Sequence, residues 1–333
     1  MNSSVEDAIK SAIPFALLIG ASVLSLPTHA QSGAFPNRPV KIVVPATPGG
    51  NNDLIARALA PKMGEGLGQS VFIENRPGTS SLIGTQYVGK SAPDGHTILH
   101  AANTFAVAPS LVKDPGYDPI KDFVGISLTG IAPQVLLVNR NIAARSVKEL
   151  IAAAKAQKKP FSYGSAGIGG TAHIAAEMFA RQAGISMLHV PYKGASQGLS
   201  DLIGGQIDVM FDLGSTALPQ VRNGSLRGLA VTSMKRFPVA ADLPTIDESG
   251  LPGYEDIIFT GLLAPAGTPA DVVARLRSEV DKAVRVPETR KKFLDVGVEL
   301  TASASPAEFT QYVKAEFDKK AKLIKSIGIS PTD

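Results

Sequence analysis

The sequence predicts an α/β protein. Short runs rich in β-branched residues recur along the chain, and segments with the period of an amphipathic helix lie between them. Glycine and proline are spread among the turns, and the sequence contains no low-complexity segment or short-period repeat. After about residue 269 the strand pattern stops and only helical patterns follow. These observations predict two α/β lobes and a C-terminal helical segment.

Local signals give the expected elements in order. Strands are expected at residues 40–44, 71–73, 97–99, 135–138, 161–163, 187–190, 209–211 and 229–232, with an extended crossing at 260–264. The C-terminal helices are expected at residues 270–284, 288–296 and 307–327. Ser146 with Glu149 and Ser305 with Glu308 form capping boxes, and Thr268 precedes its helix in the same way.

The order of the elements predicts a discontinuous first lobe. Helices that follow the last strand need a surface to pack on, and the crossing at 260–264 returns the chain to the first lobe. We therefore expect residues 34–135 and 260–333 to form lobe 1, with the C-terminal helices packed on it, and residues 136–259 to form lobe 2. Two strands between the lobes make a hinge that suits closure over a ligand.

The first thirty residues resemble a signal peptide. An apolar run from Ala12 to Leu26 is followed by a small residue, Ala30, at the expected cleavage point. Glu6 and Asp7 stand where a basic excess is usual, which leaves open whether this acidic stretch is the true N-terminus. A disordered leader or a buried N-terminal helix are the alternatives. We expect a periplasmic protein, exported and cleaved near Ala30.

Composition excludes several classes of protein. The chain has 333 residues and no cysteine, which rules out disulfides, a thiol nucleophile and zinc–thiolate sites. The net charge is only +4, and the basic residues are scattered rather than clustered, so no nucleic-acid surface is indicated. We expect a monomer with no metal and no cofactor.

Two Gly-Gly segments carry the functional prediction. Residues 43–53 and 163–173 each run from an apolar strand through a Gly-Gly turn into a helix. Glycine lets a ligand approach the backbone, and the N–H groups of a helix's first turn attract anions. The sequences after the glycines run in parallel, Asn-Asn-Asp-Leu-Ile-Ala-Arg against Thr-Ala-His-Ile-Ala-Ala-Glu. Two similar lobes would each offer one such turn to a shared cleft.

Side chains near these turns are candidates for ligand contacts. Asn51 and Asn52 can donate amide hydrogens, whereas Asp53 would repel an anion unless its carboxylate turns toward the backbone. Ser165 is either a hydroxyl donor to the ligand or a partner of its own turn. His173 is expected in the first helical turn, near the cleft.

Polar residues that follow strands are further candidates. Tyr192 and Asp212 each follow an expected strand of lobe 2, where ligands gather in α/β sheets. Arg76 either reaches an anion directly or forms a loop-fixing ion pair with Glu74.

Three other kinds of site fit less well. A dinucleotide fingerprint at residues 167–172 lacks the acidic residue expected about twenty positions later. A nucleophile elbow around Ser165 has Tyr163 in place of its first glycine. His173 and Glu177 share a helix face, but a metal needs three or four ligands.

Several stretches in order resemble a known family. They are residues 39–45, 48–50 with Asp53, Ala56 and Arg57, then 74–78, 93–95, 117–119, 189–194 and 263–269. Together they resemble the Bug or TctC-type periplasmic solute-binding proteins of the tripartite tricarboxylate transporters. The resemblance extends from about Phe35 to Ile329.

The resemblance implies a type II periplasmic binding fold that closes on a small organic acid. The implied carboxylate-holding positions are Thr47, Pro48, Gly49, Gly50, Asn51, Asn52, Ser165, Gly169, Gly170 and Thr171. Ala46 and the Asn51–Asn52 pair depart from many relatives, so no relative's ligand is transferred. The resemblance implies delivery to a membrane permease. A periplasmic sensor that signals to a membrane receptor, such as a sensor kinase, is the alternative, and an exported hydrolase using Ser165 and His173 is a third reading.

Overall fold

The computed structural model describes residues 35–331. The expected signal peptide, residues 1–30, lies outside the described residues.

Strands and helices alternate up to the last strand, as the sequence predicts. The strands are β1 (Val40–Val44), β2 (Val71–Asn75), β3 (Thr97–Ala102), β4 (Phe123–Asn139), β5 (Phe161–Ser165), β6 (Met187–Pro191), β7 (Val209–Leu213), β8 (Leu226–Val231) and β9 (Ile257–Pro265). The helices are α1 (Asn51–Leu67), α2 (Leu82–Gly89), α3 (Thr104–Leu111), α4 (Val147–Ala156), α5 (Thr171–Ala183), α6 (Ala195–Gly204), α7 (Gly214–Arg222), α8 (Ala270–Val284), α9 (Pro287–Asp295) and α10 (Pro306–Ser326). Short 3₁₀ turns occur at η1 (Thr79–Ser81) and η2 (Pro238–Ala240).

The strands form two groups joined by β4 and β9. In the first lobe β1 pairs in parallel with β2 and β3, and β3 pairs antiparallel with β9. In the second lobe β5 pairs in parallel with β6 and β7, while β7 and β8 pair antiparallel with β4. Because β1 and β5 each lie beside parallel neighbours, their carboxyl ends are edges where ligands bind in α/β sheets.

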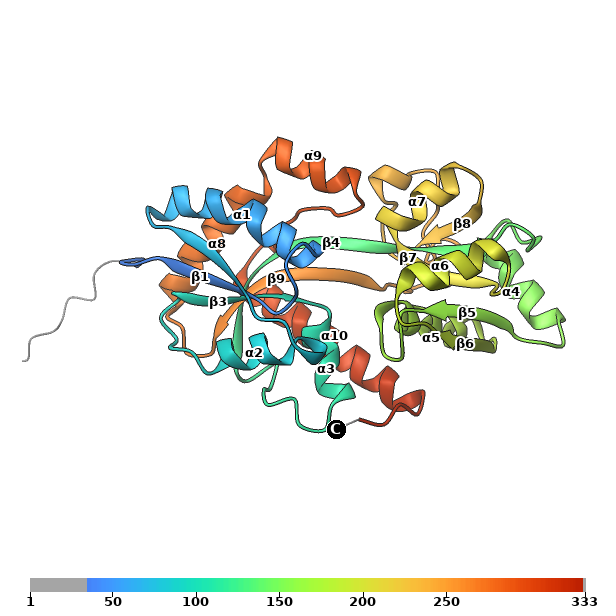
Figure 1. The fold of residues 1–333 in the computed structure, drawn as a ribbon, viewed down its shortest axis with the longest axis horizontal. Coiled ribbons are helices and arrows are strands. Elements are labelled where there is room, and N and C mark those ends of the chain that lie inside the picture. Colours follow the sequence, from blue (N-terminus) through green and yellow to red (C-terminus); the bar gives the residue numbers. More distant parts are fainter. Residues whose placement is uncertain (1–34, 332–333) are drawn as a thin grey trace, which may run out of the picture. The chain divides into compact units, whose positions relative to one another are not determined.

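The two linking strands are longer than the sequence indicates. β4 pairs with β9 from Phe123 to Pro133 and then with β7 and β8 from Gln134 onward. Figure 1 shows β4 and β9 running together from one group of strands toward the other. The first half of β4 escapes a hydrophobic-pattern search because it carries Ser127 and Thr129. Both are fully buried, with their hydroxyls bonded to other side chains.

Helices cover both faces of each group of strands. Alternation along β1 sends Ile42 and Val44 into a core with α1 and α8, while Val43 joins the opposite core with α3 and α10. In the second lobe α4 and α5 cover one face, and α6 and α7 cover the other. Each lobe is therefore a three-layer α/β/α unit.

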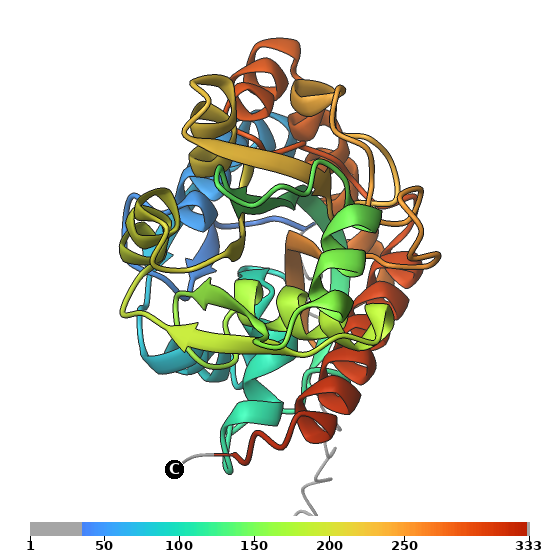
Figure 2. The same ribbon diagram turned by 90° about the vertical axis from the view of Figure 1, so that its right-hand side faces the viewer.

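The C-terminal helices reach further than expected. α8 packs on α1 and β4 in the first lobe, as predicted. α10 packs on α3 and β4 and also contacts α5 of the second lobe. In Figure 2 α10, in red, runs down the right-hand side of the view. An apolar cluster of Val107, Ile174 and Leu323 joins α3, α5 and α10.

Candidate functional site

The first glycine corner, residues 45–53, connects β1 to α1. Gly49 has φ +86°, a left-handed conformation that favours glycine, and Gly50 follows in an extended conformation as the helix N-cap. The N–H of Leu54 donates to the Gly50 carbonyl at 2.9 Å, which starts the helical bonds. The N–H groups of Asn51, Asn52 and Asp53 precede this first helical donor, so the helix offers them no acceptor. Thr47, Pro48, Gly49, Gly50 and Asn51 are exposed.

The Asp53 side chain forms hydrogen bonds that fix the backbone of this corner. One carboxylate oxygen accepts hydrogen bonds from the Gly49 N–H and from Arg57 Nε, each at 2.9 Å, and the other accepts from Asn75 Nδ2 at 2.9 Å. Burial acts to raise the pKa of Asp53, but the bonds from Arg57, Gly49 and Asn75 together keep the pKa below its usual value. The carboxylate is turned toward the backbone, as anion binding at this corner requires, and the N–H of Gly49 is used inside the turn.

The second glycine corner, residues 165–173, connects β5 to α5 and repeats this backbone. Gly169 has φ +76°, and Gly170 is an extended N-cap with φ −68° and ψ 164°, close to the −75° and 163° of Gly50. The Gly169 N–H donates to His173 Nδ1 at 2.9 Å, just as Gly49 donates to Asp53. Helical bonding starts with the N–H of Ile174, which donates to the Gly170 carbonyl, so the N–H groups of Thr171, Ala172 and His173 have no acceptor within the helix.

Two neutral imidazoles, those of His173 and His189, contact the second corner. His173 and His189 stack with their ring centroids 4.0 Å apart, and Tyr163 stacks on His189 at 4.8 Å. Burial, aided by the neighbouring His173, lowers the pKa of His189 to about 4, and burial lowers the pKa of His173. Because His173 accepts a hydrogen bond through Nδ1, its proton is on Nε2. Neither ring is charged at neutral pH.

Ser165 forms hydrogen bonds within its own turn. Its buried Oγ lies 2.7 Å from His189 Nε2 and 2.9 Å from the Gly167 carbonyl, and it accepts from the Gly167 N–H at 3.2 Å. This matches the turn-bonding alternative for Ser165. The imidazole beside it is His189 rather than His173, whose Nδ1 is already bonded to Gly169.

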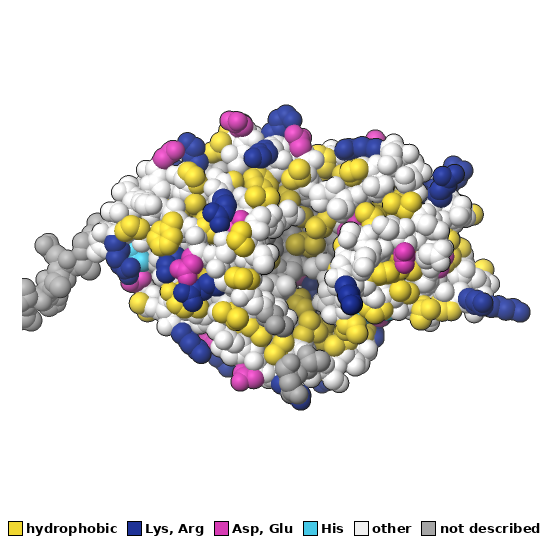
Figure 3. Space-filling view, in the orientation of Figure 1, with side chains coloured by type: hydrophobic (Ala, Val, Ile, Leu, Met, Phe, Trp, Pro, Cys, Tyr) yellow, Lys and Arg dark blue, Asp and Glu magenta, His cyan; other side chains and the backbone are white. Residues whose placement is uncertain are grey.

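A cavity of about 140 Å³ lies beside the first corner. Asn51 and Asn52 at the start of α1 line it together with Leu213 at the end of β7, so both lobes contribute. Ala132, Ile258 and Thr260 on the linking strands also line it. In the space-filling view a hollow crosses the middle of the face, and hydrophobic side chains are visible inside it (Figure 3). Residues 165–173 are not among those that line the cavity.

Three predicted site residues of the second lobe, Gly169, Tyr192 and Asp212, have different surroundings. Gly169 of the second corner abuts the first lobe, because a Cβ there would come within 2.6 Å of Leu111 on α3. Tyr192 donates through its N–H to the Ser165 carbonyl of the second corner at 2.9 Å, and through its hydroxyl to Asp201 at 2.8 Å. Asp212 is buried and accepts from Thr216 at 2.6 Å, and burial raises the pKa of Asp212.

Of the two roles expected for Arg76, direct anion contact or an ion pair with Glu74, the structure shows the ion pair. Arg76 pairs with Glu74, which also pairs with Lys41 at 2.6 Å, and its guanidinium lies 3.6 Å from the ring centre of Tyr87.

Two supporting residues were missed by the sequence reasoning. Asn75 ties Asp53 to the Ala46 carbonyl, and His189 supports Ser165. Both lie in the stretches that carried the family resemblance, which was the available signal.

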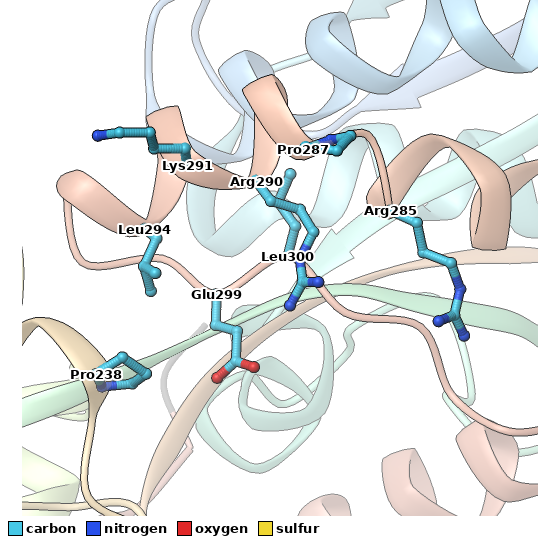
Figure 4. A pocket seen from close by; sticks show the side chains of 8 residues that line it. All are labelled: Pro238, Arg285, Pro287, Arg290, Lys291, Leu294, Glu299 and Leu300. Carbon is cyan, nitrogen blue, oxygen red and sulfur yellow. The ribbon is translucent and has the colours of Figure 1, made fainter.

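A second hollow of about 360 Å³ lies beside α9 and has a different character. Arg285, Arg290 and Lys291 line it with Glu299 and Pro238, and Figure 4 shows Arg290 extending from α9 toward the segment that carries Glu299. Neither glycine corner contributes to it.

Comparison with known proteins identifies the family. The profile described as "Tripartite tricarboxylate transporter family receptor", TctC, matches residues 55–329. The chain belongs to the TctC family. A curated family relative from a Pseudomonas species, encoded in a tcbD-tcbE intergenic region, is 37% identical over 308 residues, which are 92% of this chain and 91% of that protein.

Solved structures support the TctC assignment. An R. palustris protein with adipate is 35% identical, with a TM-score of 0.72, over 90% of this chain and all of that one. The periplasmic binding protein BugD is 36% identical, with a TM-score of 0.69, over the same shares. The predicted Bug/TctC resemblance and two-lobed α/β fold are confirmed. TctC and Bug proteins are periplasmic solute-binding receptors rather than enzymes.

Two further findings concern residues 35–331. None of their helices combines the length and the apolar character needed to cross a membrane. Within these same residues, no group of three or more His, Cys, Asp and Glu side chains is placed to hold a metal ion.

Proposed function

We propose that this TctC-family chain is a periplasmic solute-binding protein that captures a small carboxylate-bearing molecule between its lobes and delivers it to a membrane permease. The observation that carries the proposal is the pair of glycine corners. Each presents unbonded helix N–H groups at the carboxyl end of a strand, and both share one backbone conformation. Adipate bound to the R. palustris relative supports the ligand class.

The corners suit a carboxylate for an electrostatic reason. Asp53 is paired with Arg57, and His173 is neutral, so neither corner is backed by an uncompensated negative charge. A carboxylate accepting charge-assisted hydrogen bonds gains roughly 1.5–3 kcal/mol from each. A few such bonds are enough for micromolar binding after the costs of association.

The lobe boundaries belong to the same proposal. We assign residues 34–135 and 260–333 to lobe 1 and residues 136–259 to lobe 2, acting together as a monomer. The change of β4 partners after Pro133 supports a hinge at the linking strands. Closure about β4 and β9 would bring the two corners onto one ligand.

A hydrolase is disfavoured by the surroundings of Ser165. A serine nucleophile must reach its substrate, whereas this side chain is fully buried and bonded within its own turn.

Ligand binding tests the proposal directly. A thermal-shift screen of organic acids, followed by calorimetry, should find an acid that binds far more tightly than its amide. Gly50→Val should abolish that binding without unfolding the protein, because a Cβ at Gly50 meets no atom closer than 3.8 Å. Gly204→Val adds the same side chain in open space on α6 and should leave affinity unchanged. Equal binding of acid and amide, or full affinity in Gly50→Val, would contradict the proposal.

Delivery needs a separate test. Deleting the gene should abolish uptake of the acid identified above, and restoring the wild-type gene, but not the Gly50→Val variant, should rescue it. Unchanged uptake in the deletion strain would favour the sensor alternative.

A further inference from the structure

The 140 Å³ cavity beside the first glycine corner has a wall made mostly of hydrocarbon. Apolar side chains from α1, β4, β7, β9 and the segment after α9 line it: Ile55, Ile131, Ala132, Leu213, Ile258 and Val298. None of its lining residues carries a charge. An engineered apolar cavity of roughly 150 Å³ holds one benzene molecule, so this volume suits a body of about six carbon atoms.

Asn52 and Thr260 also line the cavity, but their polar groups are bonded to the protein or covered by it. Asn52 Nδ2 donates to the His100 carbonyl at 3.0 Å, and Asn52 Oδ1 is buried, with almost no surface that a ligand atom could touch. Thr260 Oγ1 lies 2.8 Å from Thr129 Oγ1 and 3.4 Å from the Gly130 carbonyl. These two side chains therefore leave the hydrocarbon character of the wall unchanged.

The backbone of the linking strands is also paired where it borders the cavity. The N–H of Ile131 donates to the Glu299 carbonyl at 2.9 Å, and the Ile131 carbonyl accepts from the Glu299 N–H at 2.8 Å. Ala132 is paired with Ile258 between β4 and β9. Groups that are already paired cannot replace the water that a ligand hydroxyl loses on entering, so a hydroxyl is penalised here and a methylene group is not.

Asn51 marks the polar end of the cavity. It is the first residue of α1, directly after Gly50, and its exposed side chain lines the cavity. Its amide can donate to a carboxylate held at the first corner. A carboxylate at this corner would therefore have its carbon chain beside the apolar wall.

We propose that the cavity receives the carbon chain of the bound acid, and that the protein prefers acids whose chain of about six carbons bears no hydroxyl group over hydroxylated acids of the same length. The inference rests on the proposed function, in which the glycine corners hold the carboxylate. Each methylene group that leaves water for the apolar wall strengthens binding, whereas each hydroxyl that does so without a partner weakens it. The preference concerns the carbon chain and not the group at its far end.

Two pairs of acids test this preference. Hexanoate and gluconate share one chain length, as do adipate and galactarate, and the second acid of each pair carries hydroxyls along the chain. By calorimetry, the acid without hydroxyls should bind at least about a hundredfold more tightly within any pair that binds, because several hydroxyls would lose water without a partner. Equal or tighter binding of gluconate or galactarate would overturn the inference and leave the proposed function standing. If another organic acid binds but none of these four does, the inference alone fails, and if no organic acid binds, both fail.

A leucine on the wall provides an independent test of where the chain lies. Leu213→Ala enlarges the cavity, so the affinity of octanoate relative to hexanoate, or of suberate relative to adipate, should rise about tenfold over the wild-type ratio, as burial of two further methylene groups predicts. Leu188→Ala is the matched control and should leave the ratio unchanged, because Leu188 is exposed on β6 and does not line the cavity. Thermal unfolding checks that both variants fold. An unchanged ratio in folded Leu213→Ala would overturn the inference.

Discussion

In both corners, the side chain four residues after the glycine, Gly49 or Gly169, accepts a hydrogen bond from that glycine's N–H. In the first corner the acceptor is the Asp53 carboxylate, and in the second it is the His173 imidazole. The carboxylate is balanced by Arg57 and the imidazole is neutral, so different chemistry gives the same result. A side-chain acceptor thus fixes each turn, and neither acceptor places an unpaired charge next to the helix N–H groups.

Asp53 should contribute stability that depends on pH. Its pKa in the folded protein lies below the usual value of about 4, so the contribution is complete above that value and is lost as pH falls through the lower, folded pKa. Asp53→Asn should lower the free energy of unfolding by about 1–3 kcal/mol at pH 7. Urea unfolding should show the difference from wild type shrinking below about pH 4.

Asp295→Asn is the control for that measurement. Asp295 forms an exposed pair with Lys291 on α9. Its replacement should change stability by no more than about 1 kcal/mol at pH 7. A loss of the same size in both variants would show that the bonds made by Asp53 have no special importance.

The left-handed glycines should differ in their tolerance of a side chain. Alanine at Gly49 or Gly169 adds backbone strain of about 1 kcal/mol or more. Only at Gly169 would the new Cβ also collide with Leu111, since nothing lies within 4 Å at Gly49. Gly169→Ala should therefore lower the melting temperature more than Gly49→Ala does. Equal effects would mean that Leu111 moves aside without cost.

Part of the site follows from residues that are close together in the chain, and part does not. The glycine turns, and the need for Asp53 to face the backbone, follow from residues close together in the chain. The His189 contact with Ser165 spans 24 positions, and the Asn75 contact with Asp53 spans 22. Such partners are set by strand pairing, β5 with β6 and β1 with β2, and no local pattern encodes them.

At the scale of single elements, two of the three helix-start signals form the expected cap. Ser146 and Ser305 accept from the N–H groups of Glu149 and Glu308 at 3.2 and 3.1 Å. The expectation for Thr268 is wrong, because its hydroxyl donates to the Pro265 carbonyl and Pro269 becomes the N-cap of α8. Thr268 closes the preceding turn instead of opening the helix.

The capping serine of α10 should contribute measurably to stability. Ser305→Ala removes the side-chain acceptor for the Glu308 N–H and should lower the free energy of unfolding by about 1 kcal/mol. Ser305→Thr keeps a hydroxyl and should lose less. Chemical denaturation of both variants checks this, and equal losses would argue against the cap as the cause.

β4 shows why the hydrophobic pattern underestimates the length of this strand. A hydrophobic run marks residues 135–138, but the first half of the strand is stabilised by hydroxyl pairs, Ser127 with Ser303 and Thr129 with Thr260. Their partners lie 176 and 131 residues away in the chain. Buried polar side chains that bond to one another interrupt the hydrophobic pattern by which a strand is recognised in a sequence.

For the whole molecule, α10 connects the two lobes at the linking strands. Lys320 on α10 is 2% exposed and forms an ion pair with Asp256, which is 1% exposed and directly precedes β9. Asp256 also accepts from Gln134 Nε2 at 3.1 Å, at the point where β4 changes partners. One buried carboxylate thus ties α10 to both linking strands, where we propose the hinge.

Breaking that pair should be strongly destabilising. Lys320→Met leaves Asp256 buried without a counter-charge, which costs about 3–5 kcal/mol in comparable cases. Adding Asp256→Asn removes the unpaired charge while keeping an acceptor for Gln134, so the double variant should recover most of the loss. Urea denaturation of the wild type, the single variant and the double variant measures the three values. If the double variant were as unstable as Lys320→Met alone, lost packing around the lysine stem would explain the effect, and the charge of Asp256 would not matter.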